Sequence, residues 1–347
     1  MQKTPVFHLF IPHFLQSIET WQQDTSFKFE TSSLSKLLTQ FVKIDSSNEE
    51  FHSIEKAFFN LVNPEHTELP IAYYRHLIQN DEKLNGLICC DPIHLRAGMN
   101  DVILTNKITD LTDDEAKELI ELLNKNFDQD GLRFIFGSNQ CWTVSFPENE
   151  TVQSHDLDSM LLQNVVNKSL ISEQRNWQVI QNETQMLLHS SEVNRHREIA
   201  GLKPVNSLWF WGAGRPQSIN FNAEKIYYND NSSSKLRAQI FAQAIGCESE
   251  VFPLNSILPL GNIDEAIGTR ILLLDQLSKP ILENEFNDFQ EEFRQIDQNI
   301  IKPLLDAWQK DEIDLVIDCC EGTLLKPEKI PAWKFWSKPM NLQEILK

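Results

Sequence analysis

The chain has 347 residues, 41 % of them hydrophobic, and a formal net charge of −19. This length and composition allow one large domain or two ordinary ones, each with a full hydrophobic core. The acidic balance disfavours binding to nucleic acid, because contacts to phosphates need a basic stripe. The sequence has no apolar run of the roughly 18 residues that a membrane span needs, and no small-residue cleavage site near its N-terminus. We therefore expect a cytoplasmic protein without a membrane partner.

The N-terminal part of the chain predicts one strand followed by helices. Residues 5–11 form an apolar run that ends at Pro12, as a buried strand would. Helical periodicity follows at residues 32–42, 48–62 and 70–79. A strand followed by helices is typical of an α/β layer.

The pattern changes near residue 85 to that of a small α+β unit. Short strand patterns cover residues 86–92 and 101–105. Thr112 and Glu115 have the spacing of a capping box that opens an amphipathic helix. The later elements are expected as strands at 132–136 and 141–146, helices at 157–167 and 173–190, a strand at 206–211, helices at 233–245 and 283–309, a strand at 313–318 and an aromatic tail at 331–339.

This order of elements predicts an α/β fold in two parts. Residues 1–84 and 191–347 are expected to form a discontinuous core with a mostly parallel sheet. Residues 85–190 are expected to form a smaller α+β domain inserted into it. A ligand is then expected in the cleft between the two domains.

Residues 193–216 carry the strongest signal of a ligand site. Between Asn194 and Arg215 there are four basic side chains and one acidic one, a local reversal in an acidic chain. An arginine can grip a phosphate or carboxylate with two charge-assisted hydrogen bonds. Gly212 and Gly214 would let a ligand approach the backbone at the carboxyl end of the preceding strand. A plainer interpretation stays open, because surface arginines commonly pair with carboxylates and two glycines make no dinucleotide fingerprint.

The same segment resembles a known enzyme family. Residues 193–216 are similar to the N-x-x-R…G-x-x-P-A-N…W-G-x-G-R-x-P passage of the archaeal-type cofactor-independent phosphoglycerate mutases, of the alkaline-phosphatase superfamily. Residues 94–124 resemble that family's substrate domain. A bacterial group of mutase-like or RpfE-type regulatory proteins is also similar, including in the tail at 333–339. The resemblance implies an alkaline-phosphatase-like core and a phosphorylated ligand.

The residues with which such mutases hold two metal ions are missing from their expected places. The first strand ends without the family's Asp-Gly, and the late strand lacks its Asp-Glu-Ala-Gly-His continuation. All nine histidines lie at or before His196, so none can join a C-terminal zinc or manganese site. Spacing gives no support to a different site made of His8, His13, Asp318, Cys319 and Cys320. We therefore expect no metal site and no cofactor, and we interpret the cysteines as small buried residues.

The leading hypothesis is a mutase-like protein without a metal-catalytic site, which binds an anionic or phosphorylated small molecule in a regulatory role. Catalytic residues are not identified. The residues expected to contact the ligand are Arg96, Asn194, Arg195, Arg197, Asn206, Trp211, Gly212, Gly214 and Arg215. A second hypothesis is an active metal-dependent mutase or phosphatase with a rebuilt site. A third is a protein-interaction module that uses Trp333, Phe335 and Trp336 of the tail.

Overall fold

A computed structural model shows how these segments fold. It describes residues 4–14, 41–45, 53–64, 69–147, 150–161, 163–165, 168, 170–230, 232–252, 268–282, 285–320 and 322–327. The aromatic tail and most of the helix expected at 32–42 lie outside these residues. The last two positions of that helix belong to a strand, β2 (Phe41–Asp45).

The chain divides into two compact units. The core unit comprises residues 1–64 and 219–347, and the inserted unit comprises residues 65–218. The inserted unit is thus longer at both ends than the 85–190 expected from the sequence. It is longer because helix α4 (Ile71–Asn80) is tied by an ion pair to strand β3 (Leu87–Ala97), and because β7 (Ser207–Trp211) pairs with the same strand.

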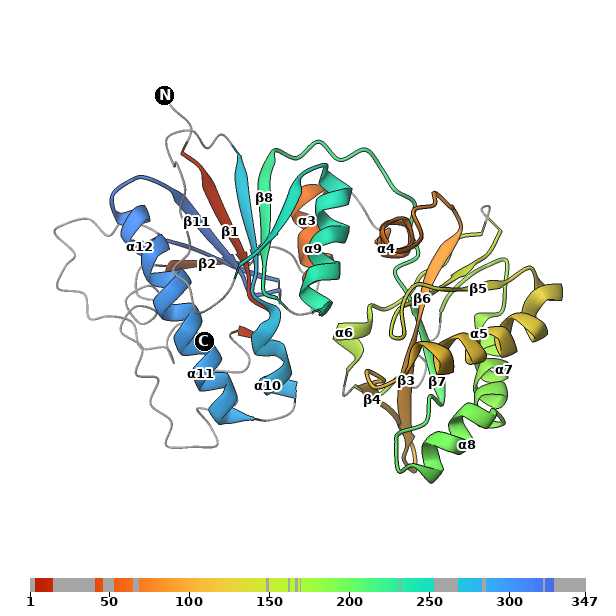
Figure 1. The fold of residues 1–347 in the computed structure, drawn as a ribbon. Coiled ribbons are helices and arrows are strands. Elements are labelled where there is room, and N and C mark those ends of the chain that lie inside the picture. The colour runs from red at the N-terminus through yellow and green to blue at the C-terminus, as the bar shows by residue number, and fades with distance from the viewer. Residues whose placement is uncertain are drawn as a thin grey trace. The chain divides into compact units, whose positions relative to one another are not determined.

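The core unit is built on a seven-stranded, mostly parallel sheet in the order β2-β12-β11-β1-β10-β8-β9 (Figure 1). Five neighbouring strands, from β11 to β9 in this order, are parallel, whereas β12 runs antiparallel to both of its neighbours. This confirms the expected α/β class with a mostly parallel sheet. The strands are β1 (Val6–Phe10), β8 (Ala223–Tyr228), β9 (Glu248–Val251), β10 (Thr269–Leu273), β11 (Asp314–Asp318) and β12 (Thr323–Pro327), in addition to β2.

Helices cover both faces of this sheet. Alternate side chains of β1 point to opposite faces, and each set packs against a different group of helices. Phe7 and Leu9 share a buried cluster with apolar residues of α11 (Phe286–Ile296), the π-helical turn η4 (Asp297–Ile301) and α12 (Lys302–Gln309). Phe10 contacts Phe58 of α3 (Ile54–Val62), and Phe58 stacks on Phe241 of α9 (Ser232–Ile245) at 3.9 Å between ring centroids. Two short elements, η3 (Asp275–Leu277) and α10 (Ser278–Leu282), follow β10.

The inserted unit is a five-stranded antiparallel sheet with helices packed on it. Its strands are β3, β4 (Val102–Lys107), β5 (Arg133–Phe136), β6 (Trp142–Ser145) and β7. Its helices include α5 (Asp113–Phe127), α7 (Trp177–His189) and α8 (Glu192–Ile199), and the 3-10 turn η1 (Asp128–Asp130) follows α5. The capping box of Thr112 and Glu115 is present at the start of α5, as predicted, and the apolar face of this helix is buried.

The helix expected at residues 157–167 is wrong beyond its first turn. Helix α6 (Leu157–Met160) is capped by the Asp156 carboxylate, which accepts from the Ser159 amide, and then ends. The chain leaves the helix because Val165 donates its amide to the Val102 carbonyl at 2.7 Å, so that backbone groups pair with β4 instead of continuing the helix. In the described part of the chain, every helix is too short or too polar to cross a bilayer.

Candidate functional site

A cavity of about 310 Å³ lies in the inserted unit where β7 ends. Three chain segments and two single residues form its wall. They are residues 84–87 ahead of and at the start of β3, residues 150–152, residues 213–216 after β7, Tyr73 of α4 and Phe146 directly after β6. A volume of this size is at the lower end of the range for small-molecule sites, which is about 300–1,000 Å³.

Two charged side chains belong to the cavity wall, and their surroundings differ. Glu150 is buried, and its carboxylate accepts hydrogen bonds from Trp177 Nε1 at 2.8 Å, Arg175 Nε at 3.1 Å and Ser172 Oγ at 3.2 Å. Its charge is therefore balanced by donors within the unit. Arg215 is exposed, and it is the one cation among the described residues of the wall.

The two glycines after β7 are needed for close packing against the chain that leads into α4. Gly212 has a positive φ of 66°, and a Cβ there would lie 2.9 Å from the Ile71 Cβ. A Cβ on Gly214 would lie 2.8 Å from backbone atoms of both Leu69 and Pro70. The Gly-x-Gly pattern thus marks a close approach within the protein itself, to the Ile71 side chain at Gly212 and to the backbone of Leu69 and Pro70 at Gly214. Of the two, Gly214 also lines the cavity.

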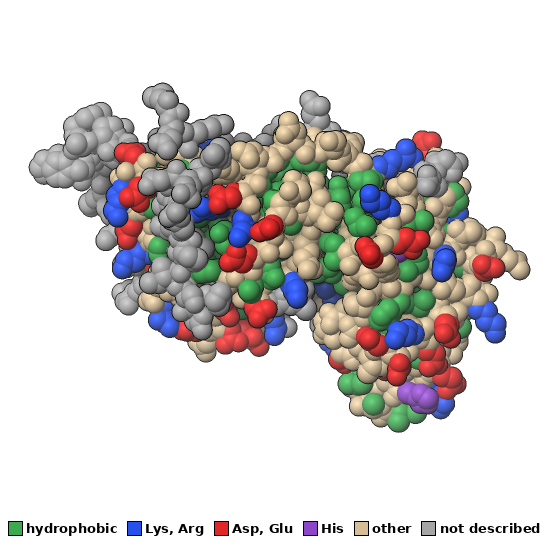
Figure 2. All heavy atoms as spheres, turned by 45° about the horizontal axis from the view of Figure 1, so that its top comes forward, with side chains coloured by type: hydrophobic (Ala, Val, Ile, Leu, Met, Phe, Trp, Pro, Cys, Tyr) green, Lys and Arg blue, Asp and Glu red, His purple; other side chains and the backbone are tan. Residues whose placement is uncertain are grey.

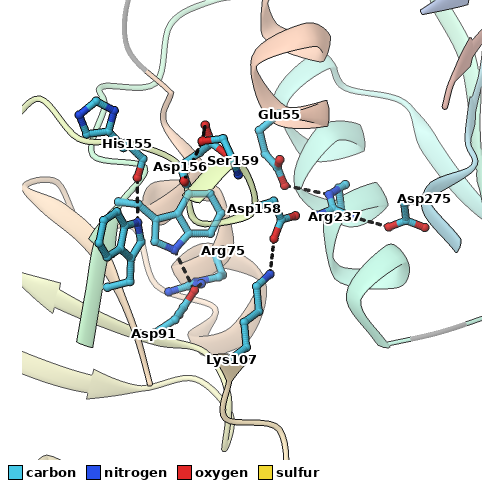
Figure 3. Close-up of polar contacts among 12 residues, drawn as sticks. Glu55, Arg75, Asp91, Lys107, His155, Asp156, Asp158, Ser159, Arg237 and Asp275 are labelled. Carbon is cyan, nitrogen blue, oxygen red and sulfur yellow. Dashed lines mark hydrogen bonds and ion pairs between the residues drawn. The ribbon is translucent and has the colours of Figure 1, made fainter. Parts of the chain in front are cut away.

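A buried ion pair fixes α4, and with it Tyr73, on the sheet. Nη1 of Arg75 lies 2.8 Å from Oδ1 of Asp91 and donates to Oδ2 at 2.9 Å (Figure 3). Trp211 Nε1 donates to the same Asp91 at 2.8 Å, so this predicted ligand residue is engaged in the fold. Burial has the largest single effect on the pKa of Arg75 and lowers it, but the charge and hydrogen bond of Asp91, together with the nearby Cys89 and Cys141, raise it by more in sum, so the pKa lies above its ordinary value. Arg75 therefore keeps its charge while buried.

The predicted residues Asn194, Arg197 and Asn206 use their polar groups within the inserted unit. Asn194 donates to the carbonyls of Leu188 and Val205 at 2.7 Å each and accepts from the Val205 amide at 2.8 Å. Asn206 makes a similar pair of bonds to the backbone of Leu95 in β3. These amides hold the segment before β7 against its neighbours.

Arg197 is 2 % exposed, and its guanidinium donates to three groups. They are the Lys203 carbonyl at 3.0 Å, the Glu115 carboxylate at 3.3 Å and the Asp110 carboxylate. Burial raises the pKa of Glu115, whereas its bonds from Thr112 and the charge of Arg197 lower it by more, so the pKa lies below its ordinary value. Arg197 thus joins α8 to the start of α5.

Arg195 and Arg96 are exposed and do not line the cavity. Arg195 donates to Glu192 one helical turn earlier, at 2.8 Å from Nε. Figure 2 shows acidic and basic side chains interspersed on the face in view, the arrangement in which such surface pairs form. Of the nine predicted ligand residues, the cavity brings together Gly214 and Arg215. Ligand contacts by all nine residues stay a prediction.

Several cavity residues were not expected from the sequence. Tyr73, Phe146 and Val152 lie far from Arg215 along the chain and carry no motif. Residues 147–156 are mostly polar, and nothing in their sequence pattern indicates that Glu150 and Val152 are buried. Only the pairing of β3 with both β6 and β7 brings these segments together.

The mutase resemblance implies a metal site in the core unit. His8 of β1 is buried, and its Nε2 lies 3.7 Å from Oδ2 of Asp318 at the end of β11. The other oxygen of Asp318 accepts from the Cys320 amide at 2.8 Å. Within the described residues, no group of three or more His, Cys, Asp or Glu side chains is placed to hold a metal ion.

A second polar cluster of the core unit joins its helices. Arg237 of α9 donates from Nε to Glu55 of α3 at 2.8 Å and from Nη1 to Asp275 after β10 (Figure 3). Ser234 of α9 donates to the same Asp275. The three charged side chains are at most 11 % exposed. Because Arg237 donates to both carboxylates, it joins α9 to α3 and to the segment that follows β10.

Comparisons with known proteins found only distant likenesses. No family model and no curated protein matches the chain. Among solved structures, it is similar to the PH0037 protein from Pyrococcus horikoshii, at 11 % identity and a TM-score of 0.45, over 94 % of this chain and 88 % of that one. It is also similar to the cofactor-independent phosphoglycerate mutase from Thermoplasma acidophilum, at 12 % identity and a TM-score of 0.40, over 93 % and 89 % of the two chains. Similarity this distant identifies neither a family nor a function.

Proposed function

We propose that the protein binds an anionic small molecule, a carboxylate or a phosphate ester, in the cavity at the end of β7. It acts in a regulatory role through this binding and not through metal-dependent catalysis. The observation that carries the proposal is the exposed Arg215 at the wall of a cavity of about 310 Å³. A cation at such a place provides the charge-assisted hydrogen bonds that a phosphate or carboxylate needs.

The electrostatics of the wall support an anion over a cation. The one carboxylate in the described wall, Glu150, accepts three hydrogen bonds, one of them from Arg175. An arriving anion therefore meets a compensated carboxylate and a guanidinium. In a chain of net charge −19, a cation at the wall of a cavity gives an arriving anion a local positive charge to approach.

Equilibrium binding tests the proposal. Titration calorimetry would compare inorganic phosphate and 3-phosphoglycerate on the full chain, on Arg215→Gln and on Arg195→Gln. Both arginines are exposed, but Arg195 lies outside the cavity wall, so its variant is a matched control for lost surface charge. We expect wild type and Arg195→Gln to bind alike and Arg215→Gln to lose about tenfold or more, as removal of a charge-assisted contact implies. Equal affinities in all three, or no binding at millimolar anion, would contradict the proposal.

An active metal-dependent mutase or phosphatase is the second candidate, and the approach of His8 to Asp318 in the core unit is the observation that favours it. Two ligands are fewer than the three that a catalytic zinc site usually draws from the protein. Plasma mass spectrometry of the purified protein, combined with an assay of phosphate-ester turnover, decides between the candidates. We expect less than stoichiometric zinc or manganese and no turnover. Stoichiometric metal with turnover would move the enzyme to first place.

A further inference from the structure

The wall of the cavity is polar on its exposed side and apolar on its buried side. The exposed members are Asn85, Thr151 and Arg215. The buried apolar members are Leu87, Phe146, Val152 and Ala213, each at most 9 % exposed. The buried Glu150 shares this inner side, but its oxygens already accept bonds from neighbouring donors. The cavity thus presents one charged rim and one largely apolar floor.

We infer that the ligand is an amphipathic anion, which places its carboxylate or phosphate at the rim beside Arg215 and a compact apolar group on the floor. This inference rests on the proposed function and specifies its ligand class. An apolar group gains from burial against Phe146 and Val152 in proportion to the area it removes from water. The hydroxyls of a sugar phosphate would instead lose hydration there, with few free partners to replace it. The cavity therefore favours an aryl or alkyl phosphate, or a carboxylate with a short apolar chain, over a bare phosphosugar.

The size of the cavity limits the apolar group. A volume of about 310 Å³ is at the lower end for small-molecule sites, so a ring or a short chain fits and a long acyl chain does not. Tyr73 and Leu84 also line the cavity, and both are half-buried. Substitution of Leu84 therefore changes the apolar side of the site without removing a fully buried core residue.

Calorimetry with phenyl phosphate, inorganic phosphate, 3-phosphoglycerate and benzyl alcohol tests the inference on the full chain. We expect phenyl phosphate to bind about tenfold more tightly than either other phosphate, because burial of a ring adds to the same anionic contact. We expect Leu84→Ser to weaken phenyl phosphate by about threefold or more and to leave inorganic phosphate unchanged. Leu202→Ser is the matched control, because Leu202 is 42 % exposed and lies outside the cavity wall.

The possible failures are distinguishable. If the three phosphates bind equally well and Leu84→Ser affects none of them, the ligand class is wrong but anion binding stands. If Arg215→Gln leaves every affinity unchanged, or benzyl alcohol binds as tightly as phenyl phosphate, the proposed function itself is wrong. Circular dichroism of each variant checks that the fold is retained.

Discussion

Arg75→Met is the change that most sharply tests how the inserted unit is held together. Arg75 is 2 % exposed and contacts both oxygens of Asp91, which is 5 % exposed. Methionine occupies much of the same space but carries no charge. The Asp91 carboxylate would then stay buried with the Trp211 indole as its remaining donor among the described side chains.

Loss of one partner from a buried ion pair costs about 3–5 kcal/mol, because the other charge is left uncompensated. Arg75→Met should therefore lower the free energy of unfolding of the inserted unit by about this amount. Asp91→Leu in addition removes the stranded charge, so the double variant should recover part of the loss. The difference between the free-energy change of the double variant and the sum of the changes in the two single variants measures the coupling of the pair.

Urea unfolding, followed by far-UV circular dichroism and by tryptophan fluorescence, gives these free energies. Two probes are needed because the two units can unfold separately. Arg133→Met is the control, since Arg133 is exposed on β5 and its loss should cost less than about 0.5 kcal/mol. If Arg75→Met costs no more than Arg133→Met, the interpretation of the pair as a structural clamp is refuted.

Three further changes test the local structure. Gly214→Ala places a Cβ against the backbone ahead of α4 and should lower the free energy of unfolding by about 1–3 kcal/mol. The control, Gly131→Ala, has open space around the new Cβ but a φ of 67°, and should lower it by only about 1 kcal/mol. Thermal unfolding measures both, and equal losses would contradict the close approach at Gly214. Thr112→Ala removes the capping box and should cost about 1 kcal/mol. Because the folded pKa of Glu115 is lowered, its contribution to stability is present above its ordinary pKa of 4.5 and is lost as the pH falls below it. Glu115→Gln should flatten the pH dependence of unfolding in that acidic window, and an unchanged profile would count against the lowered pKa.

Local signals in the sequence predicted much of the fold. The apolar run at 5–11 is β1, and the capping box at Thr112 opens α5. Within the pattern at 283–309, residues 286–309 form a continuous helical stretch that passes through the π turn η4. These elements are set by period and capping, which depend on neighbours a few residues away.

Strands β8 and β10 could not be found in this way. Arg270 is 4 % exposed within β10, and it pairs with Glu224 of β8 at 2.9 Å. In the sequence these two charges are far apart and resemble solvent-exposed residues. Only the parallel pairing of the two strands allows an arginine to be buried beside β1.

Only part of the candidate site could be predicted, because its remaining contacts also join segments that are far apart in the sequence. The cluster of arginines between 194 and 215 was correctly noticed, but the carboxylates that bind Arg197 come from Asp110 and Glu115, far earlier in the chain. Composition within one segment cannot show such partners. Arg215 and Gly214 could be named from the sequence, whereas the apolar floor depends on how β6 and β7 meet β3.

The most direct test of anion binding at the end of β7 is to locate the bound anion by nuclear magnetic resonance. A titration of the full chain with inorganic phosphate would follow backbone amide shifts. We expect saturable shifts at Leu87, Thr151, Gly214 and Arg215, which line the cavity, and loss of these shifts in Arg215→Gln. Shifts confined to the ends of β1 and β11, or no saturable shift at all, would contradict an anion site in the inserted unit.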